Sequence, residues 1–217
     1  ALFWCYAFGQ LINGRLGAYF GYKKFMMFGI FSSAVLNILI SFQSSIPVIA
    51  VLWGLNGYCQ SMVWANGIGV INNWWPKEDR GFASGVATAF SGLAQIVTYL
   101  TIMFCIVQNP EWGWRAAFRY PMLPLLIMLV VFAFVFKSKP EDIGLKPFTE
   151  DDLESEAKDK DLAVEIEKRG FFYPFKLLFS ENKVIVFCFI AAIAGIGRYG
   201  LLTWVPTYFI EYMGLSI

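Results

Sequence analysis

The sequence predicts an all-α protein that crosses a membrane several times, and both its composition and its charge distribution support this fold class. Hydrophobic residues make up 58% of the 217 residues and charged residues only 15%, with a mean hydropathy of +0.57. Soluble domains carry roughly 25% charged residues. Outside residues 141–181, the acidic residues are Glu78, Asp79, Glu111 and Glu211. The remaining stretches are long enough for membrane-spanning helices, which need about 20 apolar residues and satisfy their own backbone hydrogen bonds.

Hydropathy predicts a partial span at the start of the chain, followed by full spans. The predicted spans are residues 1–12, 25–42, 47–74, 81–107, 120–136 and 184–208.

The connectors between these spans predict the orientation in the membrane. Residues 13–24 and 76–80 are basic, whereas residues 43–46 carry no charge. Because Lys and Arg accumulate in cytoplasmic loops, we expect the loops 13–24, 76–80 and 137–183 to be cytoplasmic. Arg115 and Arg119 argue the other way, but the basic residues of the other short loops outnumber them.

Residues 137–183 form the clearest boundary in the chain. Their central part is dense in Glu, Asp and Lys and cannot bury a core. We expect a charged helix over residues 150–168, aided by pairs such as Glu154 with Lys158. An amphipathic stretch at the membrane surface should follow, carried by Phe171, Phe172, Phe175 and Leu178.

The predicted organisation is therefore a helical bundle over residues 1–136, a solvated linker over 137–183 and the first helix of a second bundle over 184–217. The chain begins inside an apolar run and ends just past a span, so we expect a fragment of a longer protein.

Several classes of function find no support. A net charge of +1 without a basic patch argues against nucleic acid as a partner. The chain has no His, and its four cysteines lack metal-ligand spacing, so we expect no metal and no cofactor. No nucleophile–base arrangement is visible, so we expect no catalytic residues and no enzyme activity.

Residues 13–24, NGRLGAYFGYKK, resemble the signature loop between the second and third helices of the major facilitator superfamily. That loop reads Gly-x-x-x-Asp-Arg-x-Gly-Arg-Arg/Lys. Gly14, Gly21 and Lys23 match it, and Lys24 adds a second basic residue one place late. Ala18 and Tyr19 stand where the family has the Asp and Arg of a charged gating latch.

Further motifs narrow the resemblance to the organophosphate:phosphate antiporter family. In order, they are NGYCQSMVW (56–64), NWWPKEDRG (73–81, with Arg80), GWRAAF (113–118), PEDIGLKP (140–147) and RYGLLTWVPTY (198–208). The resemblance covers helices two to seven of twelve. It implies a monomeric carrier of two six-helix bundles, which rock about a midplane site to exchange a phosphorylated metabolite for inorganic phosphate.

Arg198 is the leading candidate for substrate binding. It lies in the middle of an apolar span, where a charged residue costs roughly 2.5–3.5 kcal/mol and usually faces a water-filled pathway. An Arg fork suits phosphate because it donates two parallel hydrogen bonds. The resemblance makes Arg198 one of a pair of arginines that clamp the phosphate.

The resemblance assigns further residues to the cavity. Tyr6 and Gln10 share one helix face, and Gln10 falls where the bacterial sugar-phosphate transporters carry Lys. Trp64 aligns with a cavity tryptophan, and Ser91 falls where some members carry a His that modulates translocation.

Two other functions stay open. A proton-coupled facilitator of another organic anion normally needs a membrane-buried Asp, Glu or His, and the spans here have none. A transporter-like sensor of sugar phosphates could use the charged segment 150–169 as its docking surface.

Overall fold

The computed structural model describes residues 1–145, 169–170 and 173–214, and these residues form helices without a strand. The helices are α1 (Leu2–Phe20), α2 (Tyr22–Ser41), α3 (Ile46–Trp74), α4 (Arg80–Gln108), α5 (Trp114–Arg119), α6 (Met122–Val135), the 3₁₀ turn η1 (Pro140–Ile143), α8 (Tyr173–Ser180) and α9 (Asn182–Glu211). Contacts divide the chain into two units, Ala1–Asp152 and Leu153–Ile217.

Five helical stretches are long and apolar enough to cross a membrane, which agrees with a polytopic all-α fold. They are Tyr22–Ser41, Ile46–Trp74, Arg80–Gln108, Trp114–Val135 and Asn182–Glu211. Burial divides them sharply, since the apolar window of Tyr22–Ser41 is 39% buried and that of Trp114–Val135 is not buried at all. The exposed apolar faces therefore suit contact with lipid or with other transmembrane helices.

The loop predicted at residues 13–24 is wrong in its extent. Helix α1 continues to Phe20, and Gly21 alone separates it from α2. Gly21 has a φ of 91°, a backbone conformation that glycine adopts without steric cost. The residues that suggested a loop are instead packed, because Asn13 and Gly17 are buried in α1. Tertiary packing has overridden the weak helix propensity of Gly and Asn.

The expectation for residues 108–119 needs correction, and part of the expectation for residues 150–178 lies outside the described residues. The connector predicted at 108–119 contains helix α5, and Pro121, which has no N–H to donate, stands between α5 and α6. Helix α8 lies in the predicted amphipathic stretch, whereas Phe171, Phe172 and the expected charged helix at 150–168 lie outside the described residues.

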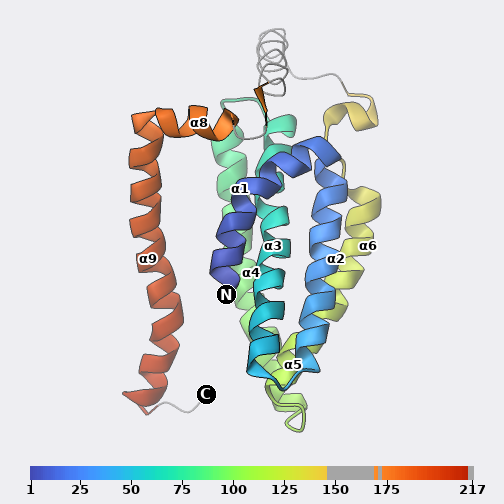
Figure 1. The fold of residues 1–217 in the computed structure, drawn as a ribbon. Coiled ribbons are helices and arrows are strands. Elements are labelled where there is room, and N and C mark those ends of the chain that lie inside the picture. The colour runs from blue at the N-terminus through green and yellow to red at the C-terminus, as the bar shows by residue number, and fades with distance from the viewer. Residues whose placement is uncertain (146–168, 171–172, 215–217) are drawn as a thin grey trace. The chain divides into compact units, whose positions relative to one another are not determined.

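Helix α3 is the centre of the unit Ala1–Asp152, and it packs mainly against α1 and α2 (Figure 1). Glycines allow this close approach, as in other membrane proteins. A Cβ at Gly9 would collide with Ser61, and one at Gly17 would collide with Asn66. At Gly29 of α2, an added Cβ would lie 2.8 Å from the Cys59 carbonyl oxygen and 2.8 Å from the Met62 Cβ.

The Gly29 contact predicts a large effect from a single methyl group. Gly29→Ala should destabilise the protein by about 1–3 kcal/mol, because neither the Cys59 carbonyl nor the Met62 Cβ lies on a movable side-chain end. Thermal unfolding in detergent micelles measures this. Gly67→Ala is the matched control, since a Cβ there meets nothing within 4 Å. Equal melting temperatures for the two variants would show that close α2–α3 packing is unimportant.

Candidate functional site

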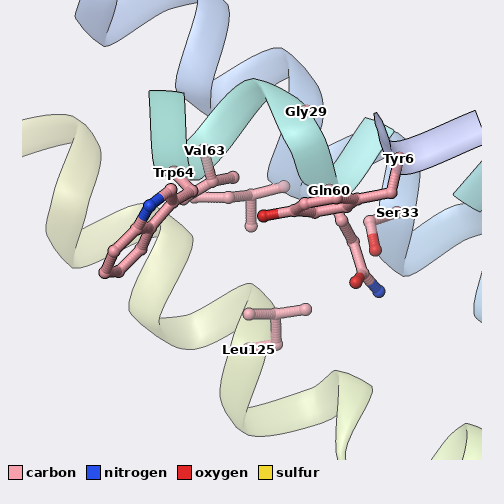
Figure 2. Close-up of a pocket in the computed structure, with 8 residues that line it drawn as sticks. Tyr6, Gly29, Ser33, Gln60, Val63, Trp64 and Leu125 are labelled. Carbon is pink, nitrogen blue, oxygen red and sulfur yellow. The ribbon is translucent and has the colours of Figure 1, made fainter. Parts of the chain in front are cut away.

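A cavity of about 440 Å³ opens between helices α1, α2, α3 and α6. It is lined by Tyr6, Gly29, Ile30, Ser33, Gln60, Val63, Trp64 and Leu125. Figure 2 shows the Tyr6 ring extending over the cavity, with Trp64 of α3 to its left in this view and Leu125 of α6 below it. None of the lining side chains carries a formal charge, so the cavity offers hydroxyl, amide and aromatic groups to a ligand.

Hydrogen bonds hold two parts of the cavity wall in place. Gln10 Nε2 donates to the Tyr6 hydroxyl at 2.8 Å, which joins the two residues along one face of α1. Ser33 Oγ donates to Asn56 Oδ1 at 2.6 Å, linking α2 to α3 behind the cavity. Asn37 Nδ2 donates to the same Asn56 oxygen at 3.3 Å, while Asn56 Nδ2 has no partner among the described residues.

The structure brings together some of the predicted site residues. Tyr6 and Trp64 line the same cavity, and Gln10 reaches it through its bond to Tyr6. Ser91 is an exposed residue of α4 and does not line this cavity.

The sequence analysis missed Ser33 and Gln60 as cavity residues. Gln60 lies four residues before Trp64, so the same helical spacing that joined Tyr6 to Gln10 would have placed Gln60 and Trp64 on one face of α3.

Arg198 lies in the other unit, near the middle of α9. Its guanidinium carbon is 5.9 Å from the centre of the Tyr199 ring, and its side chain is exposed. Within the described part of the chain, no carboxylate pairs with Arg198. The apolar helix therefore carries a cation without an acidic partner of its own, which is costly inside a membrane.

The predicted signature-loop residue Lys23 is a structural contact at one end of the unit Ala1–Asp152. Its Nζ donates to the Ala133 carbonyl oxygen at 2.6 Å, and its backbone N–H donates to Ser138 Oγ at 3.1 Å. A lysine side chain that reaches the last turn of a neighbouring helix satisfies an unpaired carbonyl there and complements that helix's dipole. Lys23 thus ties the start of α2 to the end of α6.

Other motif residues meet at the same end. Asn73 Nδ2 donates to the Ser138 carbonyl oxygen, and the Trp74 indole donates to the Lys137 carbonyl oxygen. Arg80 folds back on α3 and donates to the carbonyl oxygens of Asn72 and Trp75. The structure therefore brings the motifs at 13–24 and 73–81 together at Lys137 and Ser138, just before the motif at 140–147. Lys24 and Gly14 make no such link: Lys24 is exposed, and a Cβ at Gly14 would only touch Ala65.

Two neighbouring residues of α3 give a test of the cavity. Gln60 is exposed and lines it, whereas Met62 is 5% exposed and faces α2. In a background without the native cysteines, Gln60→Cys should react with a small water-soluble thiol reagent at least about tenfold faster than Met62→Cys, because only the thiolate in contact with water is a nucleophile. Mass spectrometry of the labelled protein measures both rates. Equal rates would mean that water does not reach this cavity.

Known proteins resemble the chain over most of its length. A glycerol-3-phosphate transporter of Bacillus subtilis is 26% identical over 97% of this chain and 48% of its own length. A probable sulfoacetate transporter of Cupriavidus necator is 24% identical over 98% of the chain and 47% of its own length. Sugar phosphate exchanger 3 of Xenopus laevis is 24% identical over 71% of the chain and 31% of its own length.

The chain thus spans about half or less of the length of these curated relatives, all of which are named as transporters or exchangers and not as enzymes. No solved structure matches the chain. The family model of the Major Facilitator Superfamily matches residues 1–217, and the chain belongs to that superfamily.

Proposed function

We propose that the natural protein containing this chain is a secondary transporter that exchanges a phosphorylated metabolite for inorganic phosphate by alternating access. The observation that carries this proposal is Arg198, a cation in the middle of the apolar helix α9. Between Asn182 and Ile210 this helix contains no acidic residue, so Arg198 has no local carboxylate to neutralise it. A phosphoryl group would neutralise the guanidinium and accept two parallel hydrogen bonds from it.

The neutral cavity fits the other half of such a substrate. Tyr6, Ser33 and Gln60 offer hydroxyl and amide groups, and Trp64 offers an aromatic face. These groups suit the hydroxylated carbon skeleton of a glycerol or sugar phosphate, whereas the charge of the phosphoryl group needs a cation elsewhere. The names of the Bacillus and Xenopus relatives support the same class of substrate.

Exchange follows from the cost of an unpaired buried charge. An empty carrier would have to move Arg198 through the membrane without a counter-ion, which is unfavourable. With phosphate or an organophosphate bound, the charge is compensated during reorientation. The spans of this chain contain no Asp, Glu or His before Glu211 that could carry a coupled proton, which favours exchange over proton coupling.

A carrier of another organic anion is the second candidate. The sulfoacetate-transporter relative covers 98% of the chain and supports it. Gln10 also stands where the resemblance places a Lys in the sugar-phosphate transporters, which leaves the cavity with less positive charge. A sulfonate has the same trigonal set of oxygens as a phosphoryl group, and Arg198 would bind it in the same way.

The proposed architecture keeps the bundle at 1–136, the linker at 137–183 and the start of a second bundle at 184–217, in a monomer. The contact boundary between Asp152 and Leu153 falls inside the proposed linker, which supports this organisation. Tyr6, Gln10, Trp64, Ser91 and Arg198 remain the proposed binding residues. The end of the first bundle that carries Lys23, Lys24 and Arg80 would face the cytoplasm.

Arg198 variants of the natural protein test the proposed phosphate contact. Arg198→Ala should weaken binding of both inorganic phosphate and glycerol 3-phosphate at least about tenfold and abolish exchange, because charge-assisted hydrogen bonds contribute about 1.5–3 kcal/mol each. Arg198→Lys keeps the charge but loses the fork, so it should fall between wild type and Ala. Equilibrium binding to purified protein measures both affinities.

Arg169→Ala is the matched control, since Arg169 lies outside α9 and contacts the Tyr173 ring. It should bind phosphate as wild type does. If the Arg198→Ala protein also binds phosphate with wild-type affinity and inserts normally into the membrane, Arg198 does not bind the phosphoryl group.

The proposed orientation predicts unequal labelling of two exposed loop residues, Glu78 and Pro110. In a cysteine-free background on intact cells, an impermeant thiol reagent should label Pro110→Cys and leave Glu78→Cys unlabelled until the cells are permeabilised. The reason is the excess of Lys and Arg near Glu78, which favours the cytoplasmic side. The reverse pattern would contradict the proposed orientation.

A further inference from the structure

At the end of the first unit opposite to Lys23, one hydrogen bond and two aromatic rings hold Arg119, and part of its guanidinium makes no bond. Arg119 Nε donates to Ser41 Oγ at 2.9 Å. One face of the guanidinium lies over the Phe42 ring, at 4.2 Å, and it also lies over the Trp112 ring, at 4.1 Å. Cation–π contacts of this kind fix an arginine in place. Its two terminal nitrogens donate to no atom of the described residues.

A separate cavity of about 270 Å³ adjoins this arginine. It is lined by Ile38, Trp112, Arg119, Tyr120 and Leu123. Ile38 precedes Ser41 by three residues in α2, and Leu123 follows Arg119 by four, so both lie about one helical turn deeper in the span than the arginine. Leu123 is 62% exposed, and the apolar faces of α2 and α6 continue from it along the span.

Nothing acidic nearby compensates the Arg119 charge. Glu111 is the acidic residue of this loop, and its Oε1 accepts a hydrogen bond from the Trp112 indole at 3.2 Å. No ion pair between Glu111 and Arg119 is present in this part of the chain. The neighbouring Arg115 differs from Arg119, because its Nη2 already donates to the Gln43 carbonyl oxygen and to Ser44 Oγ. Both terminal nitrogens of Arg119 are therefore available for an anion, whereas Arg115 already uses one of its two.

We propose that the cavity at Arg119 binds a membrane phospholipid, with the phosphodiester on the Arg119 guanidinium and an acyl chain against Ile38 and Leu123. A phosphodiester matches the planar fork of an arginine. Trp112 and Tyr120 suit the level of the lipid headgroups, where amphipathic rings collect. A free phosphate ion would leave the aliphatic side of the cavity without a contact, which favours a lipid as the source of the phosphate. This site is separate from the proposed transport site and does not depend on it.

Lipid titration of the purified, delipidated natural protein tests the proposal. Dioleoyl phosphatidylglycerol should bind, as counted by native mass spectrometry, and should raise the melting temperature. Arg119→Gln should weaken that binding at least about tenfold and remove most of the lipid-dependent rise. Arg115→Gln, the matched control, should retain wild-type affinity. A purely structural role for Arg119 would lower the melting temperature but leave the lipid-dependent rise intact, and that result would overturn the proposal.

Three further ligands test which part of the phospholipid the site binds. Dioleoylglycerol has the acyl chains without the phosphate and should bind at least about tenfold more weakly than phosphatidylglycerol. Inorganic phosphate and glycerophosphoglycerol have no acyl chains and should not displace the lipid. Displacement by either at similar concentration, or tight binding of dioleoylglycerol, would contradict the assignment to a phospholipid.

Leu123→Asn keeps the contacts of Arg119 and changes only the aliphatic side of the cavity. It should also weaken binding of phosphatidylglycerol, and it keeps the proposal testable if Arg119→Gln does not fold. Wild-type lipid affinity in Leu123→Asn would overturn the proposed placement of the acyl chain.

Discussion

The close packing of α3 against α1 and α2 is the constraint on which the rest of the first unit depends. Asn13, Asn56 and Asn66 are completely buried at these helix contacts, and Asn13 Nδ2 donates to Ser61 Oγ at 2.7 Å. Inside a membrane no water can replace such bonds, so each hydrogen-bonded pair favours one register of the two helices. The glycines on α1 and α2 allow the backbones to approach closely enough for Asn13 to reach Ser61 and for Ser33 to reach Asn56. The register in turn places Tyr6, Ser33 and Trp64 around one cavity.

The sequence predicts the class of fold well because the membrane imposes it. Long uncharged stretches can only be spanning helices, and the predicted spans from residue 25 onward correspond to α2, α3, α4, α6 and α9. The predictions of secondary structure fail where tertiary packing determines whether a segment is helical. Gly14, Arg15 and Gly17 suggest a loop, yet they are helical because α3 accepts α1 closely at Asn66. Helix α5 was also missed, since its six residues are too few to show a clear period.

The candidate site is only partly predictable for a similar reason. Tyr6 and Trp64 were identified through a family resemblance, and the structure does place them on one cavity. Ser33 was not identified from the sequence, because its position at the cavity depends on how α2 packs on α3. Hydropathy does not report that contact. Lys23 was expected in the signature loop at 13–24, and Arg80 in the motif at 73–81. In the structure they bind carbonyl oxygens near the ends of α6 and α3, which gives the same basic residues a role in holding helices together.

Arg198 and Arg119 differ in depth in the membrane, and depth determines which anions each would meet. Arg198 lies in the middle of an apolar helix, so under the proposed function its ligand would enter through the transport pathway. Arg119 lies at the end of a span beside aromatic residues, where lipid headgroups are available. For both arginines we propose an oxyanion as the ligand, because each guanidinium has N–H donors available for one.

The central claim is that Arg198 must be neutralised by an anion before the carrier reorients, and counterflow tests it most directly. The natural protein would be reconstituted in vesicles with or without internal phosphate, and uptake of labelled glycerol 3-phosphate would be followed with and without a pH gradient. The account predicts uptake only into phosphate-loaded vesicles, at a rate that the pH gradient does not change. Uptake into phosphate-free vesicles driven by the pH gradient would contradict it.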